Sequence, residues 1–224
     1  MTDLRLVIFD VDGTLVDSQN EIWASMQAAY AAQGLPAPER LAVLGIVGLS
    51  LHAAFARLSP HLNDPARDEL VVAYKAAYLD LRQRNGAGSS PFYPGARATL
   101  ERLNSDPAKL LALATGKSRR GLDALIDAHG LGRFFISRQT ADQHPSKPHP
   151  SMILACLRDA GVDPSQAVMV GDTSYDMEMA RAAGVRTVGV TWGYHSPESL
   201  GADAIIADFA QLPETMNSLL EPVA

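Results

Sequence analysis

Hydrophobic and polar positions follow two different patterns along this chain. Between about residues 17 and 90, apolar residues recur at helical spacing, with helical patterns over 41–44, 51–58 and 68–81 separated by glycine or proline. A first helical stripe runs from Ile22 to a stop at Gly34. This stretch shows no strand pattern, so we expect it to be helical throughout.

The remainder of the chain alternates short apolar runs with helical patterns. The runs predict strands at 6–9, 110–114, 134–136, 168–170, 187–190 and 204–206. Helices are predicted at 97–103, 122–129, 151–160 and 173–183. Alternating strands and helices are typical of an α/β fold with a doubly wound parallel sheet and right-handed crossovers.

The domain organisation follows from the change of pattern. We expect an α/β core formed by residues 1–16 and 91–224, interrupted by a small all-helical insertion over 17–90. The segment 85–91, rich in glycine and serine, is the clearest linker and marks the return to the core.

Composition excludes several classes of protein. Among 224 residues, 25 acidic side chains outnumber 19 basic ones, and no Lys/Arg cluster offsets the charge of −6, which argues against a nucleic-acid partner. We see no signal peptide and no apolar stretch near the ~20 residues of a membrane helix, so no membrane partner is expected. The single cysteine, Cys156, sits in a helical pattern and fits core packing in a reducing, cytoplasmic setting.

The first predicted strand runs directly into two carboxylates. Asp10 and Asp12 lie at its carboxyl end, where open α/β sheets place their ligands, and Gly13 permits a sharp turn there. Two acidic side chains this close repel each other unless a divalent cation lies between them. This feature indicates a metal site, although an acidic loop at a strand end is the plainer interpretation.

Polar residues follow other predicted strands as well. Thr115 ends one strand, Asp172 and Asp176 follow another, and Lys147 lies just before a helix. Because parallel strands point the same way, we expect these groups to meet in one crevice. Carboxylates, a hydroxyl and an ammonium group suit a magnesium ion and a phosphoryl group.

Each of these residues also has a plainer interpretation. Thr115 and Lys147 fit an ordinary strand end and a solvated loop. Asp172 is suited to capping the next helix, and Asp176 to an exposed position on it. Their combined order along the chain favours one shared site.

That order resembles the four motifs of the haloacid dehalogenase superfamily. The segments that carry the resemblance are Asp10-Val11-Asp12-Gly13-Thr14-Leu15, Thr115-Gly116, Lys147-Pro148 and Gly171-Asp172-Thr173 with Asp176. The helical insertion, here called the cap, resembles the first cap type of that superfamily. Pro94-Gly95, Lys147-Pro148-His149-Pro150 and the segment 189–194 are similar to the phosphoglycolate phosphatase-like branch.

The resemblance implies a magnesium-dependent phosphatase that cleaves a small, phosphoglycolate-like phosphate monoester through an aspartyl-phosphate intermediate, with 2-phosphoglycolate as the first candidate substrate. It implies that Asp10 attacks phosphorus and that Asp12 is the general acid and base. Magnesium would be held by the side chain of Asp10, the backbone carbonyl of Asp12 and Asp172, with support from Asp176. The phosphoryl oxygens would be bound by Thr115, Gly116 and Lys147, and the backbone N–H groups of Val11 and Asp12 would add to this cradle.

The cap is expected to close over the site and contact the leaving group. Its polar candidates are His52, Arg57 and the turn at 48–50, although His52 equally fits a packed helix. Trp192 and His195 either line the mouth or belong to a packed loop.

Other activities are compatible with parts of the pattern. A dehalogenase would not need Asp12 or Asp172. A β-phosphoglucomutase-like phosphoryl transferase has the same motifs and cap type, and the sequence does not separate it from a phosphatase. A phospho-acceptor signalling receiver would not need a cap. The sequence leaves the substrate open, and leaves the assembly open between a monomer and a homodimer.

Overall fold

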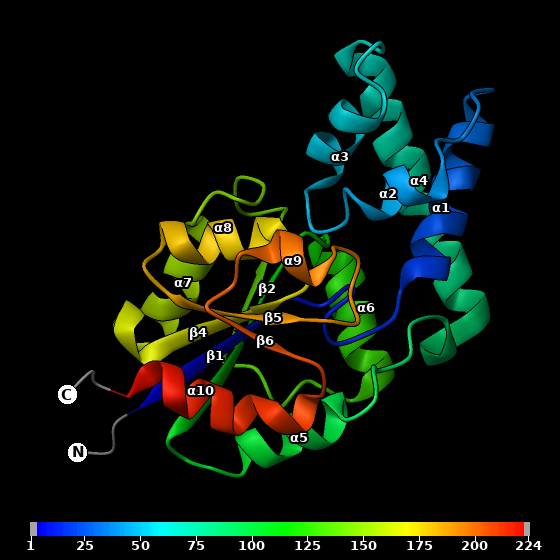
Figure 1. Ribbon diagram of the computed structural model, residues 1–224. Coiled ribbons are helices and arrows are strands. Elements are labelled where there is room, and N and C mark those ends of the chain that lie inside the picture. The colour runs from blue at the N-terminus through cyan, green and yellow to red at the C-terminus, as the bar shows by residue number, and fades with distance from the viewer. Residues whose placement is uncertain (1–3, 222–224) are drawn as a thin grey trace.

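The computed structural model of the protein describes residues 4–221. A parallel sheet in the order β3-β2-β1-β4-β5-β6 lies at the centre of the core (Figure 1). Its strands are β1 (Arg5–Phe9), β2 (Lys109–Thr115), β3 (Ser137–Thr140), β4 (Ala167–Gly171), β5 (Arg186–Val190) and β6 (Ala204–Ile206). All described strand pairs are parallel, which confirms the predicted fold class.

The central strand is fully covered on both faces. In β1, Val7 and Phe9 pack against one layer of helices, and Leu6 and Ile8 against the other. The first layer consists of α5 (Ala96–Asn104), α6 (Arg119–His129) and α10 (Leu212–Leu220), and the second of α7 (Ser151–Ala160) and α8 (Ser174–Ala182). A strand buried on both faces needs a continuous apolar run, which is why the apolar run at 6–9 predicted this strand.

One predicted strand is displaced. The apolar run at 134–136 does not form a strand, and β3 begins at Ser137, which pairs with Ala112 of β2. Phe134 and Phe135 are buried from a turn, while Ile136 is half exposed. The apolar run at 134–136 therefore reflects buried aromatic side chains and not a strand. The edge strand β3 is polar, as edge strands often are.

The cap stands over the carboxyl ends of the strands (Figure 1). It contains α1 (Gln19–Ala32), α2 (Arg40–Leu44), α3 (Leu51–Leu58) and α4 (Asp64–Asn85). Its helices share an apolar cluster separate from those of the core, with Met26, Phe55 and Leu70 fully buried. The boundaries at 16/17 and 90/91 stay a prediction.

Helix α4 is longer than the pattern indicated. Asn63 caps its start by accepting a hydrogen bond from the N–H of Ala66 at 3.0 Å, and the helix continues through Asn85 into the predicted linker. There, a short 3₁₀ turn (Gly86–Ser89) leads back to the core. No helix between residues 4 and 221 combines the length and apolar content needed to cross a bilayer.

A buried ion pair joins the two ends of the cap. Arg82 on α4 donates to Glu21 on α1 at 3.1 Å, and both side chains are almost wholly buried. Ser89 and Ser90 donate to the same carboxylate at 2.9 and 2.6 Å. This network therefore holds the two segments that connect the cap to the core close to each other.

Short helical elements complete the core. The short helix α9 (Pro197–Leu200) follows β5, and a 3₁₀ turn at Phe209–Gln211 precedes α10. A further 3₁₀ turn at Pro164–Gln166 leads into β4. None of these elements reaches the crevice at the strand ends in the described structure.

Candidate active site

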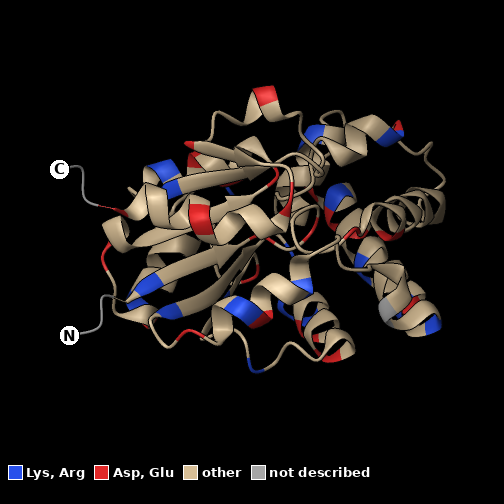
Figure 2. Ribbon diagram, turned by 60° about the horizontal axis from the view of Figure 1, so that its bottom comes forward, with Lys and Arg blue, Asp and Glu red and all other residues tan. Residues whose placement is uncertain are grey.

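The predicted site residues lie together at the carboxyl ends of β1, β2 and β4. Because β1 lies between β2 and β4, the loops that follow these strands are neighbours. Figure 2 shows acidic residues in the loops between the sheet and the cap. Asp10, Thr115 and Asp172 are all buried there.

Three carboxylates form the centre of this group. One carboxylate oxygen from each of Asp10, Asp172 and Asp176 lies within 4.8 Å of the others, and all three side chains are buried. Asp172 accepts from the Thr14 hydroxyl at 2.8 Å and from the backbone N–H of Tyr194 at 2.9 Å. Asp10 differs, since within the described structure its Oδ2 has no polar partner.

Lys147 connects two of these carboxylates. Its Nζ lies 2.9 Å from Asp10 Oδ1 and donates to Asp176 Oδ1 at 2.6 Å, and the side chain is fully buried. Burial by itself would lower the pKa of Lys147, but the adjacent carboxylates of Asp10 and Asp176 raise it above the ordinary value. Lys147 is therefore a fixed cation, and the solvated-loop interpretation does not apply.

Asp176 also organises the start of α8. Thr173 caps this helix, and Asp176 Oδ2 accepts from the backbone N–H of Thr173 at 3.1 Å and from its hydroxyl at 2.6 Å. Thr173, not Asp172, is thus the capping residue, which leaves Asp172 directed to Thr14 and the loop at Tyr194. Asp176 is fully buried, so its exposed interpretation is wrong.

Among the described residues of the site, buried carboxylates outnumber the lysines beside them. Four buried aspartates, Asp10, Asp12, Asp172 and Asp176, face two lysines, Lys117 and Lys147. Burial raises the pKa of Asp10 to about 7 against the opposing effect of Lys147. Burial, followed by the charges of Asp10 and Asp176, raises the pKa of Asp172 well above its ordinary value. A hard divalent cation fits this oxygen donor set and would relieve the excess negative charge.

Asp12 has a separate environment from the three clustered carboxylates. Lys117 donates to its two oxygens at 2.8 and 2.9 Å, and the Ser18 hydroxyl donates to Oδ1 in a short hydrogen bond. Ser18 precedes α1, but its side chain makes no capping bond to that helix and donates to Asp12 instead. The carboxylate of Asp12 is therefore held in one position at the edge of the cavity.

Lys117 is the residue that sequence reasoning missed. Besides binding Asp12, its Nζ lies 4.7 Å from the centre of the Tyr78 ring on α4 of the cap. Burial would lower the pKa of Lys117, but the Asp12 carboxylate raises it above its ordinary value. Its position two residues after Thr115 at a strand end was the available signal, but nothing in the sequence shows that its side chain meets Asp12.

Two glycines allow the close approaches in this site. Gly13 has a φ of 82°, and a β-carbon there would collide with the Asp172 carboxylate. At Gly116, a β-carbon would lie 2.7 Å from the carbonyl oxygen of Leu49 and closer still to that of Gly48. The turn of the cap at 48–49 thus rests directly on the loop after β2.

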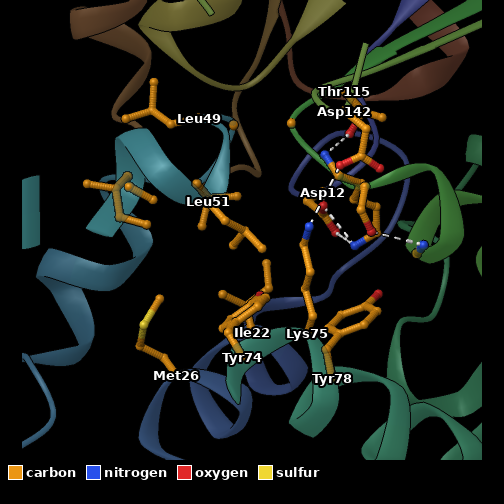
Figure 3. Close-up of a pocket in the computed structure, with 18 of the residues that line it drawn as sticks. Asp12, Ile22, Met26, Leu49, Leu51, Tyr74, Lys75, Tyr78, Thr115 and Asp142 are labelled. Atoms are coloured by element: carbon orange, nitrogen blue, oxygen red, sulfur yellow. Dashed lines mark hydrogen bonds and ion pairs between the residues drawn. The ribbon is translucent and has the colours of Figure 1, made fainter. Parts of the chain in front are cut away.

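A cavity of about 270 Å³ lies between the cap and the strand ends. Figure 3 shows Ile22, Met26, Tyr74 and Tyr78 on one side of it, and Asp12 and Thr115 on the other. Asp10, Gly116 and Lys117 also line the core side. The cavity therefore joins the carboxylate cluster to a largely apolar cap surface.

The polar cap residues predicted to contact substrate lie elsewhere. His52 pairs with Asp68 at 3.4 Å on an exposed surface, and Arg57 donates to Tyr175 at 2.6 Å. Neither lines the cavity, whereas Gly48 and Leu49 of the predicted turn do. His52 therefore forms its pair within the cap, and Arg57 contacts the core.

Trp192 and His195 belong to packed loops. The Trp192 ring contacts Phe209, with centroids 4.7 Å apart, and its N–H donates to the Thr14 carbonyl at 3.1 Å. His195 accepts from the backbone N–H of Ser174 at 3.2 Å and contacts the carbonyl of Gly45 in the cap at 3.2 Å. His195 therefore joins core to cap outside the cavity.

Comparison with known proteins agrees with this arrangement. The family model described as haloacid dehalogenase-like hydrolase matches residues 7–190. A probable phosphatase, IndB, from Dickeya dadantii is 35% identical, over 96% of this chain and 95% of that protein. The phosphoglycolate phosphatase of Vibrio vulnificus is 30% identical, over 94% and 95% of the two chains.

Solved structures show the same fold. The crystal structure of a predicted phosphoglycolate phosphatase from Haemophilus somnus superposes with a TM-score of 0.83. Its sequence is 26% identical, and the alignment covers 96% of this chain and 99% of that one. Core and cap are thus both part of the similarity.

Proposed function

This chain belongs to the haloacid dehalogenase-like hydrolase family, and we propose that it is a magnesium-dependent phosphatase acting on small phosphate monoesters. The observation that carries the proposal is Asp10, whose Oδ2 is buried at a cavity without a polar partner among the described residues. An unpaired carboxylate oxygen of this kind is available to attack phosphorus. Similarity to phosphatases and phosphoglycolate phosphatases supports this chemistry.

The first half of the reaction forms an aspartyl-phosphate. A carboxylate oxygen of Asp10 forms a bond to phosphorus while the ester P–O bond breaks. Asp12 donates its proton to the departing alkoxide, which leaves as the alcohol. Asp12 is suited to this role because Ser18 and Lys117 hold its carboxylate at the cavity edge.

The second half returns the enzyme to its starting state. Asp12, now ionised, takes a proton from water, and the water oxygen bonds to phosphorus as the Asp10–phosphorus linkage breaks. Inorganic phosphate leaves and both aspartates recover their original protonation. Thr115, the N–H of Gly116 and Lys147 are proposed to hold the phosphoryl oxygens, and the N–H groups of Val11 and Asp12 to add to that cradle.

Magnesium fits the donor set at the carboxylate cluster. Asp10, the backbone carbonyl of Asp12 and Asp172 are proposed to hold it, with Asp176 in support through its bonds to Lys147 and Thr173. When bound, the ion supplies charge neutralisation for the phosphoryl group.

The setting of the reaction is proposed from the remaining observations. The thiol of Cys156 is buried in the core, and burial raises its pKa to about 12, which supports a structural thiol in a reducing, cytoplasmic setting. The substrate is a free small molecule, and the choice between monomer and homodimer stays open.

The test measures phosphate release from p-nitrophenyl phosphate and from alkyl phosphates, with magnesium and with excess EDTA. We expect hydrolysis by the wild-type protein with magnesium, loss in EDTA, and loss in Asp10→Asn because the nucleophile is removed while its shape is kept. Free phosphate as the product also separates this enzyme from a phosphoryl transferase, which would return a phosphorylated alcohol.

Two controls make the result specific. Asp80→Asn changes an exposed carboxylate on α4 and should keep wild-type rates. Full activity of Asp10→Asn, or full activity in EDTA, would contradict the covalent mechanism or the metal requirement, respectively.

A further inference from the structure

The cap side of the cavity is almost wholly apolar. Ile22, Met26, Val47, Leu51 and Tyr74 contribute side chains to it. Among the described cap residues that line the cavity, Lys75 alone carries a charge. This surface faces the position that the leaving alcohol would occupy opposite Asp12 and Thr115 (Figure 3).

The cations near the cavity are already paired or lie toward solvent. Lys117 binds both oxygens of Asp12, and Lys75 lies 3.8 Å from Asp142 with both side chains about two-fifths exposed. Arg120 lines the cavity from α6, but it is exposed. The deep part of the cavity thus offers no free cation among the described residues.

This arrangement is unfavourable for the ester of a two-carbon acid. The carboxylate of such an ester lies directly beyond the ester oxygen, so it would be placed between Asp12 and the apolar cap surface. A charge buried there without a partner costs free energy, and the nearby carboxylate adds repulsion. Phosphoglycolate therefore fits the phosphoryl end of the cavity but not its cap end.

An apolar ring fits the same space. The cavity of about 270 Å³ is near the lower end of the ~300–1,000 Å³ typical of small-molecule sites, which is more room than a phosphoryl group and two carbons need. The rings of Tyr74 and Tyr78 lie 6.2 Å apart and nearly parallel, and both residues line the cavity.

We propose that the preferred substrate is a phosphate monoester whose alcohol carries an uncharged, ring-sized apolar body, and that the cap selects this class over esters of small carboxylic acids. This inference rests on the proposed phosphatase function. It assigns substrate choice to Met26, Leu51, Tyr74 and Tyr78 in place of His52 and Arg57.

The test compares esters whose alcohols differ in shape more than in leaving ability. Values of kcat/KM are measured with magnesium for benzyl phosphate, ethyl phosphate and 2-phosphoglycolate. We expect benzyl phosphate to exceed each of the others by about tenfold or more, as expected for burial of a ring. An equal or higher value for 2-phosphoglycolate overturns the inference while leaving the phosphatase function intact.

Two leucine-to-alanine variants in the cap test whether the cavity lining selects the ring. Leu51→Ala should lower kcat/KM for benzyl phosphate about tenfold more than kcat/KM for ethyl phosphate, because the ring loses more contacts than the ethyl group. Leu41→Ala is the matched control, since Leu41 is 84% exposed on α2 and does not line the cavity. An equal loss for both esters in Leu51→Ala would mean that the residue does not select the ring.

Binding gives a readout that does not depend on turnover. Titration calorimetry with magnesium compares 2-phenylethylphosphonate with 3-phosphonopropionate, which are uncleavable matches of benzyl phosphate and 2-phosphoglycolate. We expect the ring compound to bind about tenfold more tightly, and tighter binding of the acid overturns the inference. Absence of hydrolysis for every ester would instead refute the proposed function, and this inference with it.

Discussion

At the scale of one residue, Asp10 combines burial with the negative charge of neighbouring carboxylates. Its carboxyl group is fully buried beside two other carboxylates, and burial raises its pKa to about 7. In the folded, metal-free chain Asp10 therefore holds a proton between about pH 4 and pH 7 that the unfolded chain has lost. Stability of the metal-free protein falls as pH rises through that range, because the folded state must give up this proton.

Magnesium binding should consequently depend on pH. The ion must displace the proton from Asp10, so we expect the magnesium Kd to be about tenfold larger at pH 6 than at pH 8. Titration calorimetry in two buffers of different ionisation enthalpy would measure both the Kd and the protons released. In Asp80→Asn, which alters an exposed carboxylate, the same pH dependence should persist. An affinity that stays constant between pH 6 and pH 8 would contradict the raised pKa of Asp10.

At the scale of one element, α4 shows how the cap is tied to the core. Its last turn carries both a buried and an exposed ion pair. Arg82 reaches the buried carboxylate of Glu21, whereas Arg84 pairs with Asp80 on the surface. Ser89 and Ser90, which follow the helix, complete the buried network. The end of α4 therefore sets where the cap returns to the core.

The two pairs should differ sharply in their contribution to stability. Arg82→Met leaves the Glu21 carboxylate buried without its cation and should cost about 3–5 kcal/mol in the free energy of unfolding. The matched variant Arg84→Met breaks only the surface pair and should cost about 0–1 kcal/mol. Urea unfolding followed by far-ultraviolet circular dichroism measures both, and the double variant with Glu21→Met should recover part of the loss. Equal losses in the free energy of unfolding for the two single variants would show that the buried pair contributes no more to stability than the surface pair.

At the scale of the whole molecule, the cap and the core form one site. Tyr175 of α8 donates to the Gly45 carbonyl at 3.0 Å, and the backbone N–H of Ser50 donates to the Ser146 hydroxyl at 2.9 Å. At Gly116 the cap turn comes so close that a methyl group would overlap backbone atoms. These contacts describe a closed arrangement in which the cavity lies between the two parts.

Gly116→Ala should hinder this closure. The added methyl group meets rigid backbone at Gly48 and Leu49, so closing should cost about 1–3 kcal/mol, or roughly 5–150-fold in kcat/KM. Small-angle scattering should show a larger radius of gyration than in the wild type. Gly132→Ala is the control, because a methyl group there meets only the far end of Arg138 at 4.0 Å. Unchanged activity and size in Gly116→Ala would show that tight closure at this point is not required.

The sequence by itself determined the fold class and the edge at which the polar residues gather. A buried parallel strand needs a continuous apolar run, and the chain direction then decides which end carries Asp10, Thr115 or Asp172. These are properties of local pattern, and they can be read without knowing any contact. The helices at 51–58 and 151–160 were predicted for the same reason, since Ser50 caps the start of the first, Gly161 ends the second, and each has its own apolar face.

Only the tertiary structure decided what surrounds those residues. The pairing of Lys117 with Asp12 joins positions 105 residues apart, and that of Arg82 with Glu21 joins positions 61 apart. The apolar cavity exists because α1, α3 and α4 of the cap lie over the carboxyl ends of the strands, and the start of β3 at Ser137 depends on its pairing with β2. Side-chain direction and the approach of distant elements set such contacts, and neither is encoded in the local spacing of apolar and polar residues.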